Sequence, residues 1–298
     1  MQFVIERSIA FLTLIILGVY IKSHHKYHQE LFDGITWLMM HITLPCVIAI
    51  TMNSKVFPLE TLWLISLGAL CNIALLLSCL CLKKDKLYQA TCMISVSGFN
   101  IGCFALPLVN GLFHDEAMLA LCMFDLGNAV MCLGMNADIA KLRKGEPINI
   151  QSLLQNTLHS CSVWTYLIML LLCLFRVSLP SLAVSFMETA GNANPLLAML
   201  SIGMAMNLHI KHDDKTCMIQ CVIQRAGIAI LMATAMQFLP ISVDMRNMLT
   251  LLCLSPISAV SPVFAKKLHL HHEVSANINS IYMFVSMFFM CGYMLIFL

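Results

Sequence analysis

Long apolar stretches recur from one end of the sequence to the other, and they constrain the fold more than any other feature. We count about ten, each roughly 20 residues long, the length that a helix needs to cross about 30 Å of hydrocarbon. Their bounds are roughly 3–22, 29–52, 58–82, 88–112, 115–140, 149–175, 179–208, 216–238, 245–266 and 274–298. Of the 298 residues, 60% are hydrophobic and 11% are charged, whereas soluble domains contain roughly 25% charged residues. We therefore expect an all-α membrane protein with about ten transmembrane helices, numbered helix 1 to helix 10 in chain order.

The connections between these stretches are short and polar, which leaves no space for a soluble catalytic or nucleic-acid-binding domain. The formal net charge of +2 gives no indication of a nucleic-acid partner. Polar residues from Lys22 to Lys26 follow the first stretch, in place of small residues suited to cleavage, so we interpret it as helix 1 and not as a signal peptide. The 14 cysteines are scattered singly. They therefore indicate neither a disulfide framework nor a zinc site, and we expect no metal and no cofactor.

Basic residues divide unequally between the two sides of the expected helices, and the more basic side should be cytoplasmic. The connections after helices 1, 3, 5, 7 and 9 contain twelve: Lys22, Lys26, Lys83, Lys84, Lys86, Lys141, Arg143, Lys144, Lys211, Lys215, Lys266 and Lys267. The N-terminus and the connections after helices 2, 6 and 8 contain four: Arg7, Lys55, Arg176 and Arg246. This pattern predicts a multi-pass protein of the cell membrane, or of the inner membrane in a Gram-negative bacterium. Both termini would be outside, in the periplasm in that case.

The connection 141–148 divides the chain almost at its midpoint. The first half, 1–140, and the second half, 149–298, each contain five expected helices, and 141–148 would be a cytoplasmic connector. Because five is odd, the second half must be inverted relative to the first. Weak sequence support comes from Pro45 in helix 2 and Pro195 in helix 7, each followed by an apolar run that ends in Met-Asn.

The fourth helix of each half combines residues that interrupt helices. Helix 4 contains Gly98, Asn100, Gly102 and Pro107, and helix 9 contains Ser255, Pro256, Ser258, Ser261 and Pro262. A proline within a helix removes a backbone donor and clashes with the preceding turn, so we predict local unwinding in both. Unwound backbone at membrane depth is tolerated only where it is buried in protein or lines a cavity. Inverted repeats with one broken helix in each half are typical of secondary transporters, and the exposed N–H groups of half-helices suit an anionic substrate. Ordinary proline kinks in packed helices are the alternative.

These segments resemble the auxin efflux carrier family, which includes the plant PIN-FORMED auxin exporters and many bacterial carriers. The run from Ser255-Pro256 through Pro262 to Lys266 is similar to the family's paired-proline segment. Asn100 and Pro107 have the family's seven-residue separation, and Phe124-Asp125-Leu-Gly-Asn128 resembles bacterial members. The long cytoplasmic loop of the plant proteins is absent. This favours the bacterial branch, whose characterised members tend to carry small carboxylates.

The resemblance implies two inverted five-helix repeats in which the broken helices 4 and 9 cross near mid-membrane at the substrate site. Helices 1, 2, 6 and 7 would form a scaffold, often dimeric, against which the transport helices 3–5 and 8–10 move. The implied function is secondary active transport of a small organic anion, a mono- or dicarboxylate, by alternating access. The expected partners are this anion, the lipid bilayer, a second copy of the chain in a homodimer, and a proton as candidate coupling ion. The candidate substrate-binding residues are Asn100, Pro107, Asp125, Asn128, Ser255, Pro256, Ser258, Ser261 and Pro262.

Two ionisable residues lie deep within expected helices, where a charge costs about 2.5–3.5 kcal/mol on insertion scales. Asp125 lies in helix 5, one turn before Asn128 and on the same face. We interpret it as a substrate or proton-coupling group, with a structural hydrogen bond to the helix 4 break as the alternative. Arg225 lies within helix 8 and would pair with Asp125, balance a carboxylate substrate, or form an internal ion pair. Asn192 and Asn194 are weaker candidates for the cavity wall.

Two other functions stay open. Within carriers, the alternative is a sodium-coupled organic-acid or bile-acid-like symporter, which the sodium dependence of flux would discriminate. A membrane receptor or sensor would bind its ligand without net flux. An enzyme is not expected, because the apolar stretches contain no nucleophile with a base, no paired aspartates and no His/Glu metal set.

Overall fold

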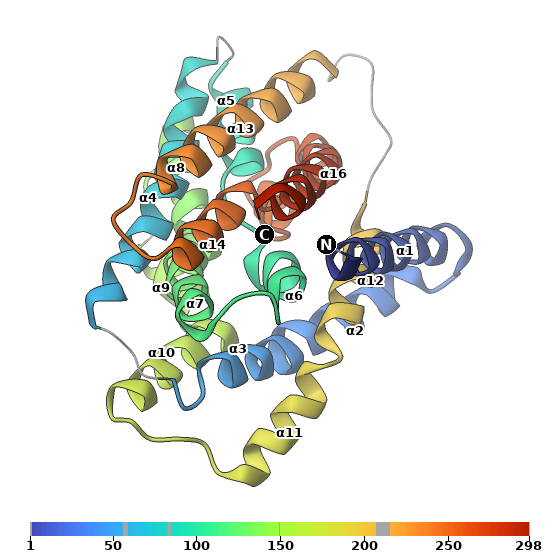
Figure 1. Cartoon of the computed structure of the whole chain (residues 1–298). Coiled ribbons are helices and arrows are strands. Elements are labelled where there is room, and N and C mark those ends of the chain that lie inside the picture. Colours follow the sequence, from blue (N-terminus) through green and yellow to red (C-terminus); the bar gives the residue numbers. More distant parts are fainter. Residues whose placement is uncertain (1, 56–58, 83–84, 149, 207–214, 298) are drawn as a thin grey trace.

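The structure is a computed structural model that describes residues 2–55, 59–82, 85–148, 150–206 and 215–297 (Figure 1). All regular elements within these ranges are helical, and none is a β-strand. Six segments of the described chain are helical, long and apolar enough to span a membrane: His28–Met52, Leu59–Cys81, Lys86–Val109, Asp115–Lys144, Met218–Met236 and His272–Phe297. This confirms the prediction of an all-α, multi-pass membrane protein. Lys83, Lys84, Lys211 and Asn207, which entered the charge count and the Met-Asn pattern, lie outside the described residues.

The helices of the first half follow the apolar stretches. In chain order they are α1 (Gln2–His24), α2 (His28–Leu38), η1 (Met39–Thr43), α3 (Leu44–Met52), η2 (Leu59–Leu62), α4 (Trp63–Ser78), η3 (Cys79–Cys81), α5 (Lys86–Val96), η4 (Ile101–Ala105), α6 (Leu106–Val109), α7 (Asp115–Val130), η5 (Met131–Met135) and α8 (Asn136–Lys144). The last of these ends at Gly145, which has a φ of 87°. A left-handed glycine of this kind is the usual end of a helix, and it lies beyond residue 140, where we expected helix 5 to end.

The second half contains α9 (Ile150–Leu158), α10 (Cys161–Leu174), α11 (Ser181–Gly191), α12 (Asn194–Ala205), α13 (Lys215–Met236), α14 (Val243–Leu254), α15 (Ser261–Lys267) and α16 (His272–Phe297). The stretches predicted as helices 6 and 7 are each divided in two. Ser160 begins α10 by accepting a hydrogen bond from the backbone N–H of Val163 at 3.4 Å. Pro195 lies in the first turn of α12, where its missing N–H group breaks no helical hydrogen bond.

Both predicted interruptions of the fourth helices are present. Residues 97–100 separate α5 from η4, and residues 255–260 separate α14 from α15. Pro262 lies in the first turn of α15 and so begins the helix after the second interruption, whereas Pro107 lies in α6, which continues η4 beyond the first interruption. The chain therefore leaves the helical conformation at Ser-Gly-Phe-Asn and at Ser-Pro-Ile-Ser.

Glycines allow two pairs of helices to pack closely. A Cβ atom added to Gly203 on α12 would lie 2.1 Å from the carbonyl oxygen of Ile15 on α1, its neighbour in Figure 1. A Cβ atom added to Gly127 on α7 would lie 1.9 Å from the carbonyl oxygen of Ile65 on α4. Such contacts between small residues are the common way in which membrane helices associate. The first interrupted segment lies in the interior, because residues 89–109 are all buried.

Candidate functional site

The two chain interruptions meet in the interior of the protein. The backbone N–H group of Asn100 donates a hydrogen bond to the carbonyl oxygen of Pro256 at 2.7 Å. Gly98 has a φ of 83°, and a Cβ atom added to it would lie 2.8 Å from the Cβ atom of Ser258. Glycine is therefore required at residue 98 both for its conformation and for the close approach of the second interruption.

Side-chain amides replace the helical hydrogen bonds that the interruptions lose. The Nδ2 atom of Asn128 on α7 donates to the carbonyl oxygen of Phe99 at 2.9 Å, and its Oδ1 atom accepts from the N–H group of Phe99 at 3.0 Å. At the second interruption, Asn279 on α16 donates to the carbonyl oxygen of Ser258 at 3.1 Å. Because buried backbone groups need partners, these amides stabilise the unwound conformation.

Further amides hold Asn128 in place. Asn72 on α4 donates to the Oδ1 atom of Asn128 at 3.2 Å, and Asn136 on α8 donates to the Oδ1 atom of Asn72 at 3.1 Å. All three side chains are buried. Asn72 and Asn136 were not among the predicted site residues, although an amide within an apolar helix is the kind of signal that could have identified them.

A cavity of about 540 Å³ lies against the two interruptions. This volume falls within the usual range for small-molecule sites, about 300–1,000 Å³. Of the predicted site residues, six line it: Asn100, Asp125, Asn128, Pro256, Ser258 and Pro262. Pro107, Ser255 and Ser261 are buried and do not line it. Ser162 and Tyr166 on α10 and Ser201 on α12 line it without having been predicted.

Asp125 is the buried carboxylate of this cavity, and its side chain is held by two donors. The Oη atom of Tyr166 donates to Oδ2 at 2.6 Å, and the Nδ2 atom of Asn128 donates to Oδ1 at 3.0 Å. Asn128 therefore joins Asp125 to the backbone of Phe99. Tyr166 carries a single hydroxyl within an apolar helix, and its approach to a residue 41 positions away could not be read from the sequence.

Arg225 lies fully buried on α13 and outside the cavity lining. Its Nη2 atom donates to the carbonyl oxygens of Gly98 at 3.2 Å and Ser255 at 3.4 Å. The Cζ atom lies 4.5 Å from the centre of the Phe99 ring and 5.4 Å from that of Tyr282. No ion pair between Arg225 and Asp125, or any other acidic residue, occurs within the described ranges. The residue contacts both interruptions by way of their carbonyl groups.

The two weaker candidates occupy different positions. Asn192 is exposed at the end of α11, whereas Asn194 is buried at the start of α12. Asn194 accepts a hydrogen bond from the hydroxyl of Thr43 at 3.0 Å and donates to the carbonyl oxygen of Gly102 at 3.5 Å. It thus joins the proline-containing parts of predicted helices 2 and 7 to η4, without lining the cavity.

The cavity opens at one end, where its lining residues are exposed. They are Gln29 and Asp33 on α2, Ala205 on α12, and Ala259 and Val263 beside or within α15. Lys22 lies at this mouth, and its Nζ atom donates to the carbonyl oxygen of Met206 at 2.5 Å. The mouth is therefore formed by the helix ends next to the connections after predicted helices 1, 7 and 9, which are rich in basic residues.

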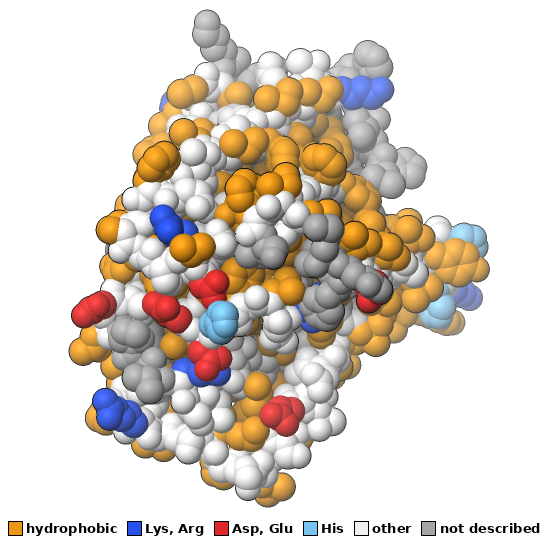
Figure 2. All heavy atoms as spheres, viewed as in Figure 1, with side chains coloured by type: hydrophobic (Ala, Val, Ile, Leu, Met, Phe, Trp, Pro, Cys, Tyr) orange, Lys and Arg blue, Asp and Glu red, His pale blue; other side chains and the backbone are white. Residues whose placement is uncertain are grey.

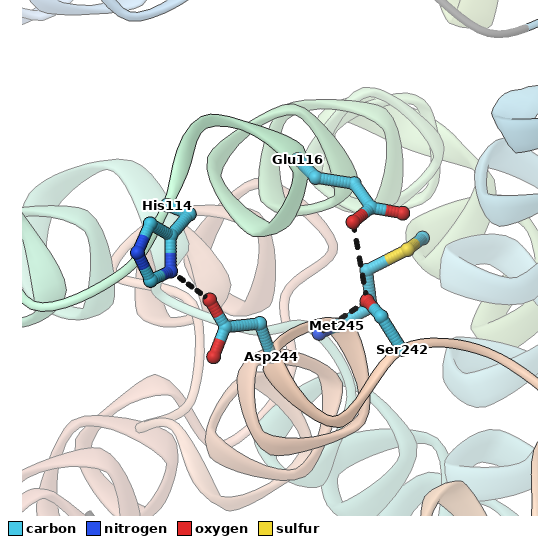
Figure 3. Close-up of polar contacts among 5 residues, drawn as sticks. All are labelled: His114, Glu116, Ser242, Asp244 and Met245. Carbon is cyan, nitrogen blue, oxygen red and sulfur yellow. Dashed lines mark hydrogen bonds and ion pairs between the residues drawn. The ribbon is translucent and has the colours of Figure 1, made fainter.

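A separate polar cluster joins the start of α7 to the start of α14 (Figure 3). The Nδ1 atom of His114 lies 2.5 Å from the Oδ2 atom of Asp244. The hydroxyl of Ser242 donates to Glu116 at 3.3 Å and accepts from the N–H group of Met245 at 3.4 Å. Figure 2 shows charged side chains gathered over these two helices. The cluster lines no part of the cavity, so we interpret it as a surface connection between helices.

No protein-family model matches the sequence, and no curated protein matches it significantly.

Proposed function

We propose that this protein is a secondary transporter that moves a small organic anion, a mono- or dicarboxylate, across the cell membrane by alternating access. The observation that carries the proposal is the meeting of two chain interruptions beside a cavity of about 540 Å³. In transporters, interrupted helices of this kind form the substrate site near the bilayer midplane. The resemblance of the same segments to the auxin efflux carrier family supports this assignment.

The proposal includes ten membrane crossings, arranged as two inverted five-helix repeats in which helices 4 and 9 cross. Helix contacts support the repeat because they occur in pairs that exchange the two halves. The contact of α1 with α12 has its counterpart in that of α10 with α3, and the contact of α4 with α7 in that of α13 with α16. Likewise, α5 packs against α16 and α14 packs against α7.

The asparagines that contact the interruptions support the same relation. Asn128 on α7 lies in the helix that follows the first interrupted helix, and Asn279 on α16 lies in the helix that follows the second. Each donates its side-chain amide to a carbonyl group of the preceding interrupted helix, at Phe99 and Ser258 respectively. In both halves, an asparagine side chain thus donates a hydrogen bond to a backbone carbonyl group of the interrupted helix.

The cavity offers separate groups for an anion and for a proton. Ile101, Gly102 and Cys103 line the cavity at the first turn of η4, where backbone N–H groups carry a partial positive charge. Asp125 lines the same cavity. A bound carboxylate and an ionised Asp125 would repel each other, so we assign to Asp125 the proton that accompanies the anion.

A second candidate substrate is an organic cation. The observation that favours it is the position of Asp125, whose side chain is buried at the cavity while the basic Lys22 lies at the mouth. An ionised Asp125 would then pair directly with the substrate, and the same assay distinguishes the two cases.

The test is flux into proteoliposomes that contain the purified protein, with a pH gradient and a panel of carboxylates and amines. We expect carboxylate flux. Asn100→Ala should lower it about tenfold or more, equivalent to about 1.4 kcal/mol of lost binding. Asp125→Asn should remove its dependence on the pH gradient, whereas it would abolish the flux of a cation. Asn192→Ala, which changes an exposed amide outside the cavity, is the matched control and should retain wild-type flux.

Two results would contradict the proposal. The first is the absence of flux for every compound tested with folded wild-type protein. The second is unchanged flux in both Asn100→Ala and Asp125→Asn.

A further inference from the structure

Two helices end beside the interruptions, and the carbonyl groups of Gly98 and Ser255, just beyond these ends, lie within hydrogen-bond distance of one and the same nitrogen atom. The first, α5, ends at Val96, and the second, α14, ends at Leu254. The C-terminal end of a helix carries a partial negative charge because its last carbonyl groups lack helical donors. In secondary transporters, such helix ends and unwound carbonyl groups coordinate the coupling cation. The space between Gly98 and Ser255 is therefore a position that attracts a cation.

Arg225 occupies this position. A single nitrogen, Nη2, reaches both Gly98 and Ser255, and the guanidinium lies over the ring of Phe99 in cation–π contact. The side chain is 0% exposed, and a buried charge is costly unless its surroundings compensate it. Within the described ranges these surroundings contain no acidic partner. Carbonyl groups accept from Nη2 and the Phe99 and Tyr282 rings face the guanidinium, whereas Nε and Nη1 have no hydrogen-bond partner among the described residues.

Other side chains serve two further carbonyl groups at the end of α14. The hydroxyl of Ser255 donates to the carbonyl oxygen of Leu252 at 2.7 Å, and that of Ser286 donates to Leu254 at 2.5 Å. Neutral donors are therefore enough for single carbonyl groups within one helix. Arg225 differs from them because it contacts both interruptions at once and brings a permanent charge, since arginine stays protonated in proteins.

We propose that Arg225 is a tethered cation, which permanently fills the cation position between the two interrupted helices and makes transport independent of sodium. It is a positioning residue, because it contacts the unwound backbone and not the cavity. The transport part of this inference rests on the proposed function, whereas the cation position itself does not. If it holds, the sodium-coupled symporter is excluded, because the position that a sodium ion would use is occupied by the protein's own charge.

The first test measures the thermal stability of the purified full-length protein in detergent. We expect Arg225→Ala to lower the Tm and guanidinium chloride, at about 20 mM, to recover part of the loss. Choline chloride at the same concentration should recover none. Arg225→Gln, which keeps hydrogen-bond donors but removes the charge, should also lower the Tm. A wild-type Tm in Arg225→Ala, or equal effects of guanidinium and choline on it, would overturn the proposal.

Arg246→Ala is the matched control. Arg246 on α14 also donates to a carbonyl oxygen, that of Gln237 at 3.2 Å, but it lies away from the interruptions. Its Tm should not respond to guanidinium more than to choline. An equal recovery of this variant would show that guanidinium acts nonspecifically, and would overturn the inference.

The second test compares wild-type flux in sodium and in choline buffers. We expect equal flux in both, and in Arg225→Ala a flux that is strongly lowered and restored in part by guanidinium. A several-fold loss of wild-type flux without sodium would overturn the proposal. The absence of any wild-type flux would instead contradict the proposed function, and the stability measurements would then decide the cation position alone.

Discussion

At the scale of single residues, Asn128 shows why an amide is needed at the interruption. Its side chain donates to Phe99 and Asp125 and accepts from Phe99 and Asn72. An aspartate would lack the donors, and a leucine would lack both functions. The same side chain therefore stabilises the unwound backbone and orients the carboxylate of the cavity.

His114 allows a prediction about pH. The hydrogen bond to Asp244, and then the charge of that carboxylate, raise the pKa of His114 above its ordinary value of 6.5. A pKa raised in the folded state means that the protonated ring stabilises the fold below the unfolded-state value, and that this contribution is lost as the pH rises through the folded-state value. We expect His114→Gln to lower the Tm at about pH 6 and to have little effect at about pH 9.

The control for this prediction is the partner of the histidine. In an Asp244→Asn background, His114→Gln should have the same small effect on the Tm at both pH values. A pH-dependent difference that persists in this background would show that another group is responsible.

At the scale of helices, glycine positions set how closely neighbours approach. The contact of α4 with α7 matters for the site because α7 carries Asp125 and Asn128. Gly68 on α4 and Gly127 on α7 each face the backbone of the other helix. A side chain at either position would separate the helices and displace the carboxylate from the cavity.

We predict that Gly127→Leu destabilises the protein by about 3 kcal/mol or more, because its Cβ atom would meet backbone that cannot rotate away. Thermal unfolding in detergent measures the effect. Gly227→Leu is the control, because Gly227 on α13 is exposed and has no neighbour within 4 Å of the added Cβ. Equal Tm values for the two variants would contradict the close contact of α4 and α7.

At the scale of the whole molecule, the mouth of the cavity lies beside connections that carry many of the basic residues. The mouth lies at the helix ends beside connections that are rich in lysine. Under the proposed topology these connections are cytoplasmic. The structure would then represent the state that is open to the cytoplasm.

A cysteine at Ala259 tests this orientation. We expect a membrane-impermeant maleimide to label Ala259→Cys in inside-out vesicles and not in right-side-out vesicles, as detected by mass spectrometry of the modified peptide. The native exposed Cys81, at the end of predicted helix 3, should behave in the same way. Ser178→Cys, in the connection after predicted helix 6, should show the opposite pattern. Labelling of Ala259→Cys from the outside would contradict a mouth that opens to the cytoplasm.

The sequence by itself determined the features that depend on neighbouring residues. The apolar stretches predicted a multi-pass helical protein, because about 20 consecutive apolar residues are the length of a membrane-spanning helix. The residues from Gly98 to Pro107 and from Ser255 to Pro262 predicted interruptions, because glycine, asparagine, serine and proline act on their own local backbone, and the structure has them at 97–100 and 255–260. The spacing of Asp125 and Asn128 placed both on one face of a helix.

Only the tertiary structure decided which of these residues meet. Tyr166 contacts Asp125 and Arg225 contacts Gly98 and Ser255, over long sequence separations that no local pattern encodes. The tertiary structure also placed Pro107, Ser255 and Ser261 outside the cavity lining, although they lie in the predicted segments. The physical reason is that an interrupted helix exposes its polar groups in several directions. Packing of the other helices determines which of those directions faces the cavity and which is satisfied within the protein.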